Sequence, residues 1–562
     1  MFDAVVIGSG MSGGIAAKEL CERGLKVLVL ERGRHIEPGK DYTDNALPWE
    51  IANANMIPET ELDNDYQIQR QCYALNESTR QFWVKDSEHP YTTSVDKPFS
   101  WIRGYHLGGR SITWGRQSYR LSEIDFEANK KDGHGVDWPI RYKDLAPWYS
   151  HVERFVGVAG SREGLSQLPD GEFLPAFGLN DGEQQFKAVI EQTFPSRHVI
   201  PGRAANLSVA QPHHEELNRY TCQNRSICDR GCSFGASFSS LSASLPAAKR
   251  TGNLTVVTDA IVTGLDQDPV TGRIIGVRVI DSNTHVGRIY KGKLVFLCAS
   301  AIASAAILLN SCSDANPRGL CNKSDQVGRN LMDHLFSIIV RGMMPGPQDS
   351  YYKGRRPTGF YIPRYRNVTD SSDQFVRGYG YQGALMRIHG PASARKPGLI
   401  GEDLKEAVRT IGPWFGYLSG FGEMLPNPNN RVTLSKSEKD RWGVPVVHID
   451  CEHGANEKAM ASQILIDGKA MIEAAGGRVI SEASEPAPPG LGVHEMGTAR
   501  MGRDPNTSVL NAWNQAHEAP NLFCTDGAAM TSSGCQNPSL TYMALTARAA
   551  DYAARQLAEG RI

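Results

Sequence analysis

Residues 4–31 read AVVIGSGMSGGIAAKELCERGLKVLVLE, and this stretch decides the fold of the chain. A run of β-branched residues at 4–7 ends at a glycine, an alanine-rich helical pattern covers 12–23, and a second apolar run covers 26–30. A strand, a glycine turn, a helix and a strand in this order are the opening of a doubly wound α/β domain of the Rossmann type.

The glycines of this stretch fit the pattern G-x-G-x-x-G of a dinucleotide site. Gly8 is expected to make a tight turn, Gly10 to let a pyrophosphate approach the backbone, and Gly13 to let the helix pack closely on the strand. The N–H groups at the helix start attract phosphates, and the carboxylate of Glu31 is placed to accept hydrogen bonds from ribose hydroxyls. This block contributes the predicted cofactor contacts Gly8, Gly10, Met11, Ser12, Gly13, Glu31 and Arg32.

The fingerprint alone does not separate NAD from FAD, but two later blocks favour the longer dinucleotide. Residues 521–525 form a predicted strand that ends at Asp526-Gly527-Ala528, and GGRSITWG at 108–115 is a glycine-framed loop suited to lie against an isoalloxazine ring. The predicted contacts outside the first block are Arg103, Gly108, Gly109, Ser111, Thr113, Trp114, Gly115, Ile261, Ala299, Ser300, Asp526, Gly527, Asn537, Pro538 and Leu540.

The composition excludes several classes of function. The 562 residues contain 60 Lys and Arg against 61 Asp and Glu, so no electrostatic footprint for nucleic acid or an anionic membrane is present. The longest apolar stretch, 294–309, is interrupted by two serines and is shorter than the ~18 residues of a spanning helix. We expect no transmembrane segment and, from the N-terminal sequence, no export signal of the chain's own.

Six motifs in the same order along nearly the whole chain resemble the glucose–methanol–choline (GMC) oxidoreductase family. They are VVIGSGMSGG, RGYHLGGRSITWG, GRNLMDH (328–334), LPNPNNRVTLS (425–435), HEMGTARMG (494–502) and DGAAMTSSGCQNPSLTYMALTARAADY (526–552). The resemblance implies α/β plus α+β architecture: a Rossmann-like FAD-binding domain built from discontinuous segments, and a substrate domain with a large antiparallel sheet.

The expected FAD-binding domain comprises 1–40, 95–125, 200–334 and 486–562, and the substrate domain 126–199 and 335–485. Residues 41–94 are expected to be a surface excursion. Residues 254–265, 276–281 and 288–297 are expected in one small sheet, whereas the alternating pattern of 335–485 predicts the large antiparallel sheet. Helices are expected at 302–310, 464–475 and 539–557.

The resemblance implies that His494 and Asn537 are the catalytic pair. Oxidation of a CH–OH group moves hydride from carbon to flavin N5 and releases the hydroxyl proton. An imidazole accepts that proton near neutral pH, and a carboxamide N–H holds the alcohol oxygen. Some family members attach FAD covalently through a histidine in a G-G-x-S-T-H-W loop. The matching residue here is Thr113, so we expect non-covalent FAD.

Cys222, Cys228 and Cys232 lie within eleven residues and are candidate metal ligands. Short spacing suits an iron–sulfur cluster, and a disulfide with a free thiol or unconnected packing cysteines remain alternatives. The spacing resembles that of bacterial FAD-dependent sugar dehydrogenases with a 3Fe-4S cluster. Relatives with an extra cysteine near position 225 differ from this chain, which has Arg225 there.

The motifs are most similar to catalytic subunits of FAD-dependent glycoside 3-dehydrogenases. The resemblance implies oxidation of the C3 hydroxyl of a glucoside or disaccharide, a cytochrome c acceptor, and a small subunit that carries the export signal to the periplasm. A cytoplasmic location is the alternative. The alternative activities are an oxygen-using pyranose oxidase, a gluconate or polyol dehydrogenase, a flavin-containing hydroxynitrile lyase, and an NAD-dependent dehydrogenase.

Overall fold

The computed structural model describes residues 1–350, 357–369, 371–388 and 398–562. Strand β1 (Phe2–Ile7) lies inside a six-stranded sheet of order β17-β18-β9-β1-β2-β5. Its neighbours β9 (Gly292–Leu297) and β2 (Val27–Leu30), and the strands β5 (Leu254–Val257) and β18 (Ala519–Cys524), all run parallel, and only β17 (Gln515–Ala516) is antiparallel. The buried apolar strands confirm the Rossmann-like prediction.

Helices pack against the apolar side chains of this sheet. Helix α1 (Met11–Glu22) follows the glycine turn and contacts α7 (Leu245–Arg250) and α12 (Ser539–Ala558), while α8 (Ala301–Leu309) follows β9. The predicted helices 302–310 and 539–557 are confirmed within one residue at each end.

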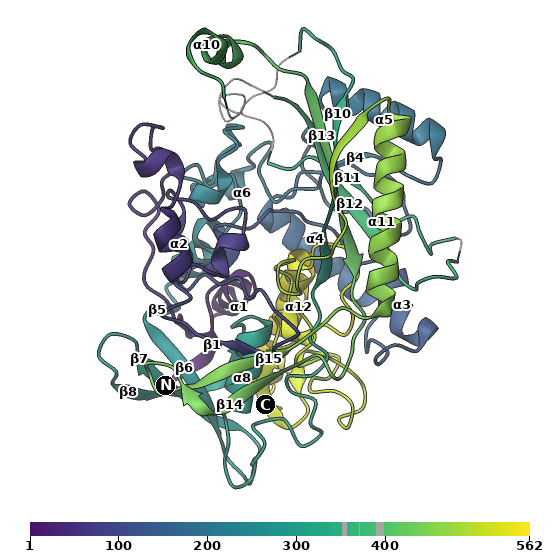
Figure 1. Ribbon diagram of the computed structural model, residues 1–562. Coiled ribbons are helices and arrows are strands. Elements are labelled where there is room, and N and C mark those ends of the chain that lie inside the picture. The colour runs from purple at the N-terminus through teal and green to yellow at the C-terminus, as the bar shows by residue number, and fades with distance from the viewer. Residues whose placement is uncertain (351–356, 370, 389–397) are drawn as a thin grey trace.

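The second large sheet is antiparallel, as predicted, and has the order β16-β10-β13-β12-β11-β4. Its strands are β16 (Arg478–Ala483), β10 (His334–Met344), β13 (Trp414–Glu423), β12 (Tyr379–Arg387), β11 (Phe360–Ile362) and β4 (Ile200–Pro201). Helix α11 (Ala455–Ala474) lies along one face (Figure 1), where a Cβ at Gly420 would come within 2.2 Å of Ile464. The helix begins nine residues before its predicted start at 464.

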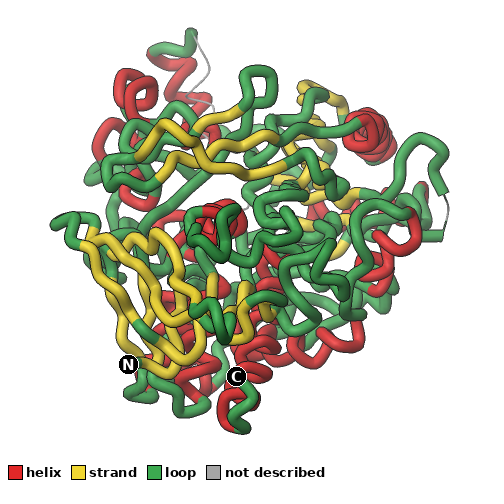
Figure 2. Tube along the Cα trace, turned by 90° about the horizontal axis from the view of Figure 1, so that it is seen from below, coloured by secondary structure: helices red, strands yellow, loops and turns green. Residues whose placement is uncertain are grey.

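Two predictions of sheet membership are wrong. Strands β5 and β9 belong to the Rossmann-like sheet, so the small sheet contains only β6 (Ala260–Gln267), β7 (Ile274–Asp281) and β8 (Gly287–Tyr290). Strands β14 (Arg431–Lys439) and β15 (Pro445–Asp450) were expected in the large antiparallel sheet, but they form a separate sheet of order β14-β15-β3, in which β15 pairs with β3 (Thr92–Thr93). Figure 2 accordingly shows strands in separate groups with helices and loops between them.

The other α-helices of the described residues lie outside the strands of the two large sheets. They are α2 (Glu59–Asp65), α3 (Glu123–Asp132), α4 (Tyr142–Val156), α5 (Asp181–Thr193), α6 (Pro212–Glu215) and α10 (Gly401–Arg409). Within 41–94, the side chains of Tyr66, Phe82 and Trp83 are buried in the core that also contains β1 and β2. No helix among the described residues is long and apolar enough to cross a membrane.

Candidate active site

A cavity of about 340 Å³ extends from the turn between β1 and α1 to the start of α12. Both members of the predicted catalytic pair, His494 and Asn537, line it. So do most predicted cofactor contacts, namely Gly8, Gly10, Met11, Ser12, Glu31, Arg32, Arg103, Gly109, Ser111, Thr113, Trp114, Gly115, Ile261, Ala299, Ser300, Asp526 and Gly527. Gly13, Gly108, Pro538 and Leu540 do not line the cavity.

Each of the three fingerprint glycines is required for a different structural reason. Gly8 has φ +96°, and a Cβ there would lie 2.4 Å from the carbonyl oxygen of Cys298. A Cβ at Gly13 would lie 1.9 Å from the Gly8 oxygen, so α1 approaches β1 only because this residue is glycine. Gly10 has an ordinary φ of −69°, and a Cβ there would meet no protein atom within 4 Å. Its side-chain direction is open because it faces the cavity, as a site for a close-lying ligand requires.

Ser9, which the motif reading left unassigned, joins three segments around the glycine turn. Its Oγ donates to Glu31 at 2.5 Å and accepts the N–H of Gly108 at 2.9 Å. Glu31 also accepts the N–H groups of Ser9 and Gly33, and burial raises its pKa above the usual range. The carboxylate is therefore held in a fixed position at the cavity wall.

Several buried donors at the cavity wall have no hydrogen-bond partner among the described residues. They include Arg32 Nε and Arg103 Nε. Leaving a buried donor unpaired costs about 1–3 kcal/mol, so such atoms indicate polar groups of a ligand. Together with the open space at Gly10, these donors fit the anionic and polar part of FAD.

The carboxylate of Asp526 forms hydrogen bonds that connect several segments of the cavity wall. It accepts the N–H of Ser300 at 2.9 Å and the hydroxyl of Ser304 at 2.5 Å, and its other oxygen accepts the N–H of Ala528. Burial raises the pKa of Asp526 to about 6. These bonds tie the end of β18 to the start of α8, which follows β9 in the chain.

His494 and Asn537 meet at the cavity although 42 residues separate them in the chain. Asn537 Nδ2 lies 3.3 Å from His494 Nε2. Burial, followed by the neighbouring His334 and Arg110, lowers the pKa of His494 well below 6.5. The imidazole is therefore neutral at physiological pH and presents a basic nitrogen.

Asp333 holds the loop that carries His494. Its buried carboxylate accepts the backbone N–H groups of Gly490, Gly492 and His494 at 2.7–3.0 Å. Burial is the main cause that raises the pKa of Asp333 to about 6. The motif GRNLMDH contains this residue, but the sequence reading gave it no role.

Two further residues contact the pair and were not predicted. His334 Nδ1 lies 2.8 Å from His494 Nδ1, and Gln382 Nε2 donates to Asn537 Oδ1 at 2.6 Å. His334 is the first residue of β10 and Gln382 lies within β12, so both come from the antiparallel sheet. A histidine at the end of the motif was the available signal for His334, whereas Gln382 belongs to no motif.

The aromatic residues of β13 divide between the two faces of the sheet. Trp414 is 1 % exposed and packs in the core with α5 and α11, so it is not available to a sugar. Phe421 lies on the opposite face, with its ring centre 6.2 Å from that of His494. Phe415 and Tyr417 alternate with the buried positions and share the face of Phe421.

The cysteine segment, residues 222–232, is connected to the cavity wall through Arg116. Arg116 lines the cavity and donates from its guanidinium to the carbonyl of Cys228 at 2.7 Å. Cys222, Cys228 and Cys232 are half-buried and unbridged. No three His, Cys, Asp or Glu side chains of the described residues are placed so that they would hold a metal ion. Arg225 pairs with Asp44 at 2.5 Å and anchors the segment.

Comparison with known proteins gives matches over nearly the whole chain. Family models described as GMC oxidoreductase match residues 87–336 and 426–546, and a model described as NAD(P)-binding Rossmann-like domain matches residues 6–44. The chain is 28% identical to a fructose dehydrogenase large subunit from Gluconobacter japonicus, over 99% of this chain and 98% of the relative. It is 29% identical to paromamine 6'-oxidase from Streptomyces fradiae, over 99% and 92%.

A solved structure of pyridoxine 4-oxidase from Mesorbium loti has the same fold. Its TM-score to this chain is 0.59 at 18% identity, with 99% of each chain covered.

Proposed function

The chain belongs to the GMC oxidoreductase family, and from this premise we propose that it is an FAD-dependent dehydrogenase of sugars. The proposed reaction oxidises a secondary hydroxyl, at C3, of a glucoside or disaccharide to a keto sugar. The observation that carries the proposal is the pair His494 and Asn537, 3.3 Å apart at a cavity whose other wall fits FAD.

When bound, FAD supplies the acceptor for the hydride that leaves the carbinol carbon. His494 Nε2 then accepts the hydroxyl proton, because the imidazole is neutral before the substrate arrives. The amide N–H of Asn537 donates to the hydroxyl oxygen and orients the C–H bond. The two nitrogen atoms are close enough for one hydroxyl oxygen, placed beside the pair, to lie within hydrogen-bond distance of both.

Three observations support the choice of substrate and the state of FAD. Two relatives with nearly full coverage are named as a fructose dehydrogenase subunit and an oxidase of paromamine. The stretch GCSFGASFSS (231–240) and the motif HEMGTARMG (494–502) resemble glycoside 3-dehydrogenase subunits and so favour C3 oxidation. Thr113 lines the cavity, while His106 does not, so no histidine of this loop is placed to attach FAD covalently.

Anaerobic mixing of the holoenzyme with methyl glucoside tests the proposal. Bleaching of the flavin and a 3-keto product are expected, whereas an unchanged spectrum with every sugar contradicts it and favours the lyase. His494→Ala should lower the rate of flavin reduction by about 10²–10⁴ while FAD stays bound. A decrease smaller than about tenfold would remove His494 from the role of base. Rapid reoxidation by oxygen with peroxide release would favour the oxidase.

We further propose that Cys222, Cys228 and Cys232 bind a 3Fe-4S cluster, which supplies one-electron transfer from reduced FAD to a cytochrome c. The support is their spacing and the charge around them. Arg116 is 4 % exposed and Arg219 is fully buried. Within the described residues, both guanidinium groups donate hydrogen bonds only to backbone carbonyl groups and one serine hydroxyl.

Buried cations without a carboxylate partner need an anion nearby. Burial lowers the pKa of Arg219 to about 9, and the Cys232 side chain opposes this effect. Thiolates or an anionic cluster would supply the missing charge. The three sulfur atoms must move together to ligate iron, because they are not arranged as a metal site in the structure.

Iron analysis and electron-transfer kinetics test this second proposal. About three irons per flavin are expected in the purified protein. Cys228→Ser should remove iron and slow reduction of cytochrome c, with sugar-to-flavin transfer unchanged. Iron-free wild-type protein, or equal cytochrome reduction in both proteins, would contradict it.

We also propose that a small subunit with an export signal carries the chain to the periplasm, which co-expression and fractionation would test.

A further inference from the structure

Five groups form a continuous row of hydrogen bonds through the candidate active site. The carbonyl oxygen of Gly534 contacts His334 Nε2 at 2.9 Å, and His334 Nδ1 contacts His494 Nδ1 at 2.8 Å. His494 Nε2 contacts Asn537 Nδ2, and Asn537 Oδ1 contacts Gln382 Nε2. The row therefore begins at a backbone carbonyl and ends on strand β12.

The carbonyl fixes the direction of every bond in the row. A carbonyl oxygen only accepts, so His334 Nε2 carries the proton. Burial lowers the pKa of His334 to about 4, so this imidazole is neutral and its Nδ1 is an acceptor. The proton of the contact between the two imidazoles then belongs to His494 Nδ1, and His494 Nε2 is left with its lone pair.

The same logic sets the carboxamide. A lone pair on His494 Nε2 faces the amide N–H of Asn537, so Asn537 Oδ1 points away from the base and toward β12. Gln382 meets that oxygen with its own N–H group. A substrate hydroxyl between the pair would thus find one acceptor for its proton and one donor for its oxygen.

We propose that His334 and Gln382 are positioning residues, which lock the tautomer of His494 and the amide orientation of Asn537 in the arrangement that alcohol oxidation needs. The inference rests on the proposed function, because it assigns roles relative to the base His494. His334 is 1 % exposed and does not line the cavity, so it acts through His494 rather than on the substrate.

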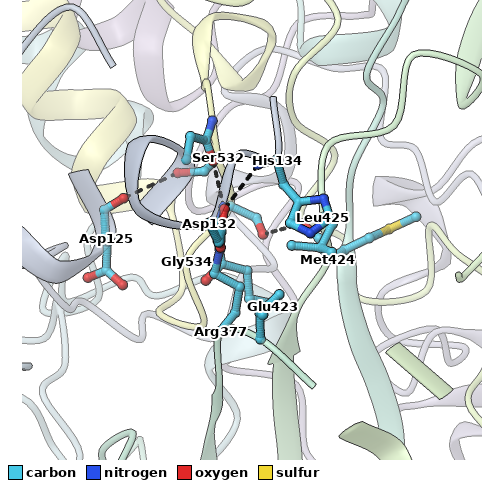
Figure 3. Close-up of polar contacts among 12 residues, drawn as sticks. Asp125, Asp132, His134, Arg377, Glu423, Met424, Leu425, Ser532 and Gly534 are labelled. Carbon is cyan, nitrogen blue, oxygen red and sulfur yellow. Dashed lines mark hydrogen bonds and ion pairs between the residues drawn. The ribbon is translucent and has the colours of Figure 1, made fainter. Parts of the chain in front are cut away.

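The fold holds both ends of the row rigidly. Gly534 has φ +63°, and a Cβ there would lie 2.7 Å from the side chain of Leu121, so any other residue would be strained at this position. Its preceding loop is anchored by Ser532 Oγ on the carbonyl of Asp125 and by Ser533 Oγ on the carbonyl of Met424. Figure 3 shows Ser532, Gly534 and Met424 within this network.

His334 is fixed through the sheet. It pairs with Glu423 across β10 and β13, and Glu423 forms a buried ion pair with Arg377 at 2.7 Å (Figure 3). Arg377 also bonds to Asn129 and Asp132 of α3, which connects the sheet to the helical part of the chain. The acceptor nitrogen of His334 therefore has little freedom to move relative to His494.

Two variants of His334 separate an acceptor role from a packing role. His334→Asn keeps an acceptor oxygen near the place of Nδ1 but loses the ring, whereas His334→Phe keeps the ring but has no acceptor. In anaerobic stopped-flow mixing of the holoenzymes with substrate, the limiting rate of flavin reduction and the substrate Kd are obtained from the same concentration series.

We expect His334→Phe to lower the limiting rate about 10- to 100-fold with the Kd unchanged. The loss is smaller than the ~10²–10⁴ of removing a general base, because part of the His494 population keeps the productive tautomer. His334→Asn should be at least fivefold faster than His334→Phe. If His334→Phe fails to bind FAD, His334→Leu replaces it as the acceptor-free variant.

Equal rates in the two variants, or a faster His334→Phe, would overturn the inference, as would failure of both acceptor-free variants to bind FAD. Any alcohol or sugar that bleaches the wild-type flavin serves as the probe. Failure of the proposed function is distinct, since it appears in the wild type as a flavin that methyl glucoside and other sugars do not reduce.

Discussion

Replacement of Gly10 and of Gly8 by alanine should have opposite effects on folding and FAD binding. The two glycines are two residues apart in the same turn, but only Gly8 has a positive φ and a carbonyl at 2.4 Å from its Cβ position. Gly10 has an ordinary φ and open space in front of it. Each variant thus serves as the matched control of the other.

The expected magnitudes follow from these geometries. An L-residue in the left-handed region costs about 1–2 kcal/mol, and forcing a methyl group against a fixed carbonyl costs a further 1–3 kcal/mol or so. Gly8→Ala should therefore lower the free energy of unfolding by about 2–5 kcal/mol. Gly10→Ala should leave the FAD-free protein unchanged or more stable by about 0.4–1 kcal/mol, because the unfolded chain loses freedom.

Binding of FAD should be weakened most by the substitution that leaves the FAD-free protein intact, Gly10→Ala. In Gly10→Ala the new methyl group occupies space that a close-lying pyrophosphate needs, so the Kd for FAD should rise at least tenfold, which corresponds to about 1.4 kcal/mol. Denaturant unfolding of deflavinated protein and titration with FAD, followed by quenching of its fluorescence, measure the two quantities. An unchanged Kd in Gly10→Ala would refute the view that the cofactor lies against this residue.

Three further predictions concern titration and the amide of Asn537. Because His494 stays neutral, the rate of flavin reduction should be constant from about pH 8 to 6.5. The rate should fall as the pH drops through about 6, where protonation of Asp333 loosens the loop that carries His494. A decrease in rate that already begins above pH 7 would contradict this. Gln382→Glu replaces a donor by an acceptor of the same shape and should lower the limiting rate about tenfold with FAD content unchanged, and an unaltered rate would oppose it. The pKa of the buried Glu19 is lowered to about 2 in the folded state, so its carboxylate stabilises the fold at pH values above its unfolded pKa near 4.5. Glu19→Gln should therefore lower the free energy of unfolding by about 3 kcal/mol at pH 7. The difference from the wild type should disappear as the pH falls toward 2, as measured by unfolding at several pH values.

The sequence was sufficient to predict the parts of the site that depend on local backbone chemistry. The turn at Gly8 and the packing at Gly13 follow from the order of strand, glycines and helix alone, and the structure gives each glycine a distinct steric reason. His494 and Asn537 were found because each lies in a motif, and the structure brings them to one cavity. Their catalytic roles remain predictions.

The supporting residues were missed because their positions arise from sheet pairing. His334 and Gln382 are 48 residues apart and lie on strands β10 and β12, with β13 between them. Nothing in the local sequence indicates that the two strands direct side chains toward the same pair of residues on the far side of the chain. Such information is contained in register, which alternation of apolar residues does not specify.

Register also explains the errors in sheet membership. A single residue, Lys291, separates β8 from β9, but the two strands belong to different sheets. Residues 288–297 read RIYKGKLVFL, and the polar stretch at 291–293 does not show that the residues on either side of it belong to different sheets. Similarly, the alternation in β14 and β15 indicates one buried face without identifying the sheet to which the strands belong, and the neighbour of β15 in that sheet is the two-residue strand β3.

The choice of an imidazole beside His494 also determines the charge of His494, the proposed base. A carboxylate in place of His334 would select the same tautomer, but its negative charge would stabilise the imidazolium and raise the pKa of His494. The neutral ring of His334 supplies the acceptor without that charge, and the nearby Arg110 lowers the pKa of His494 further. His494 is therefore free of a proton before a substrate binds. In the proposed reaction such an imidazole would hold a proton taken from a hydroxyl only weakly, so release of that proton would return the side chain to its neutral state for the next cycle.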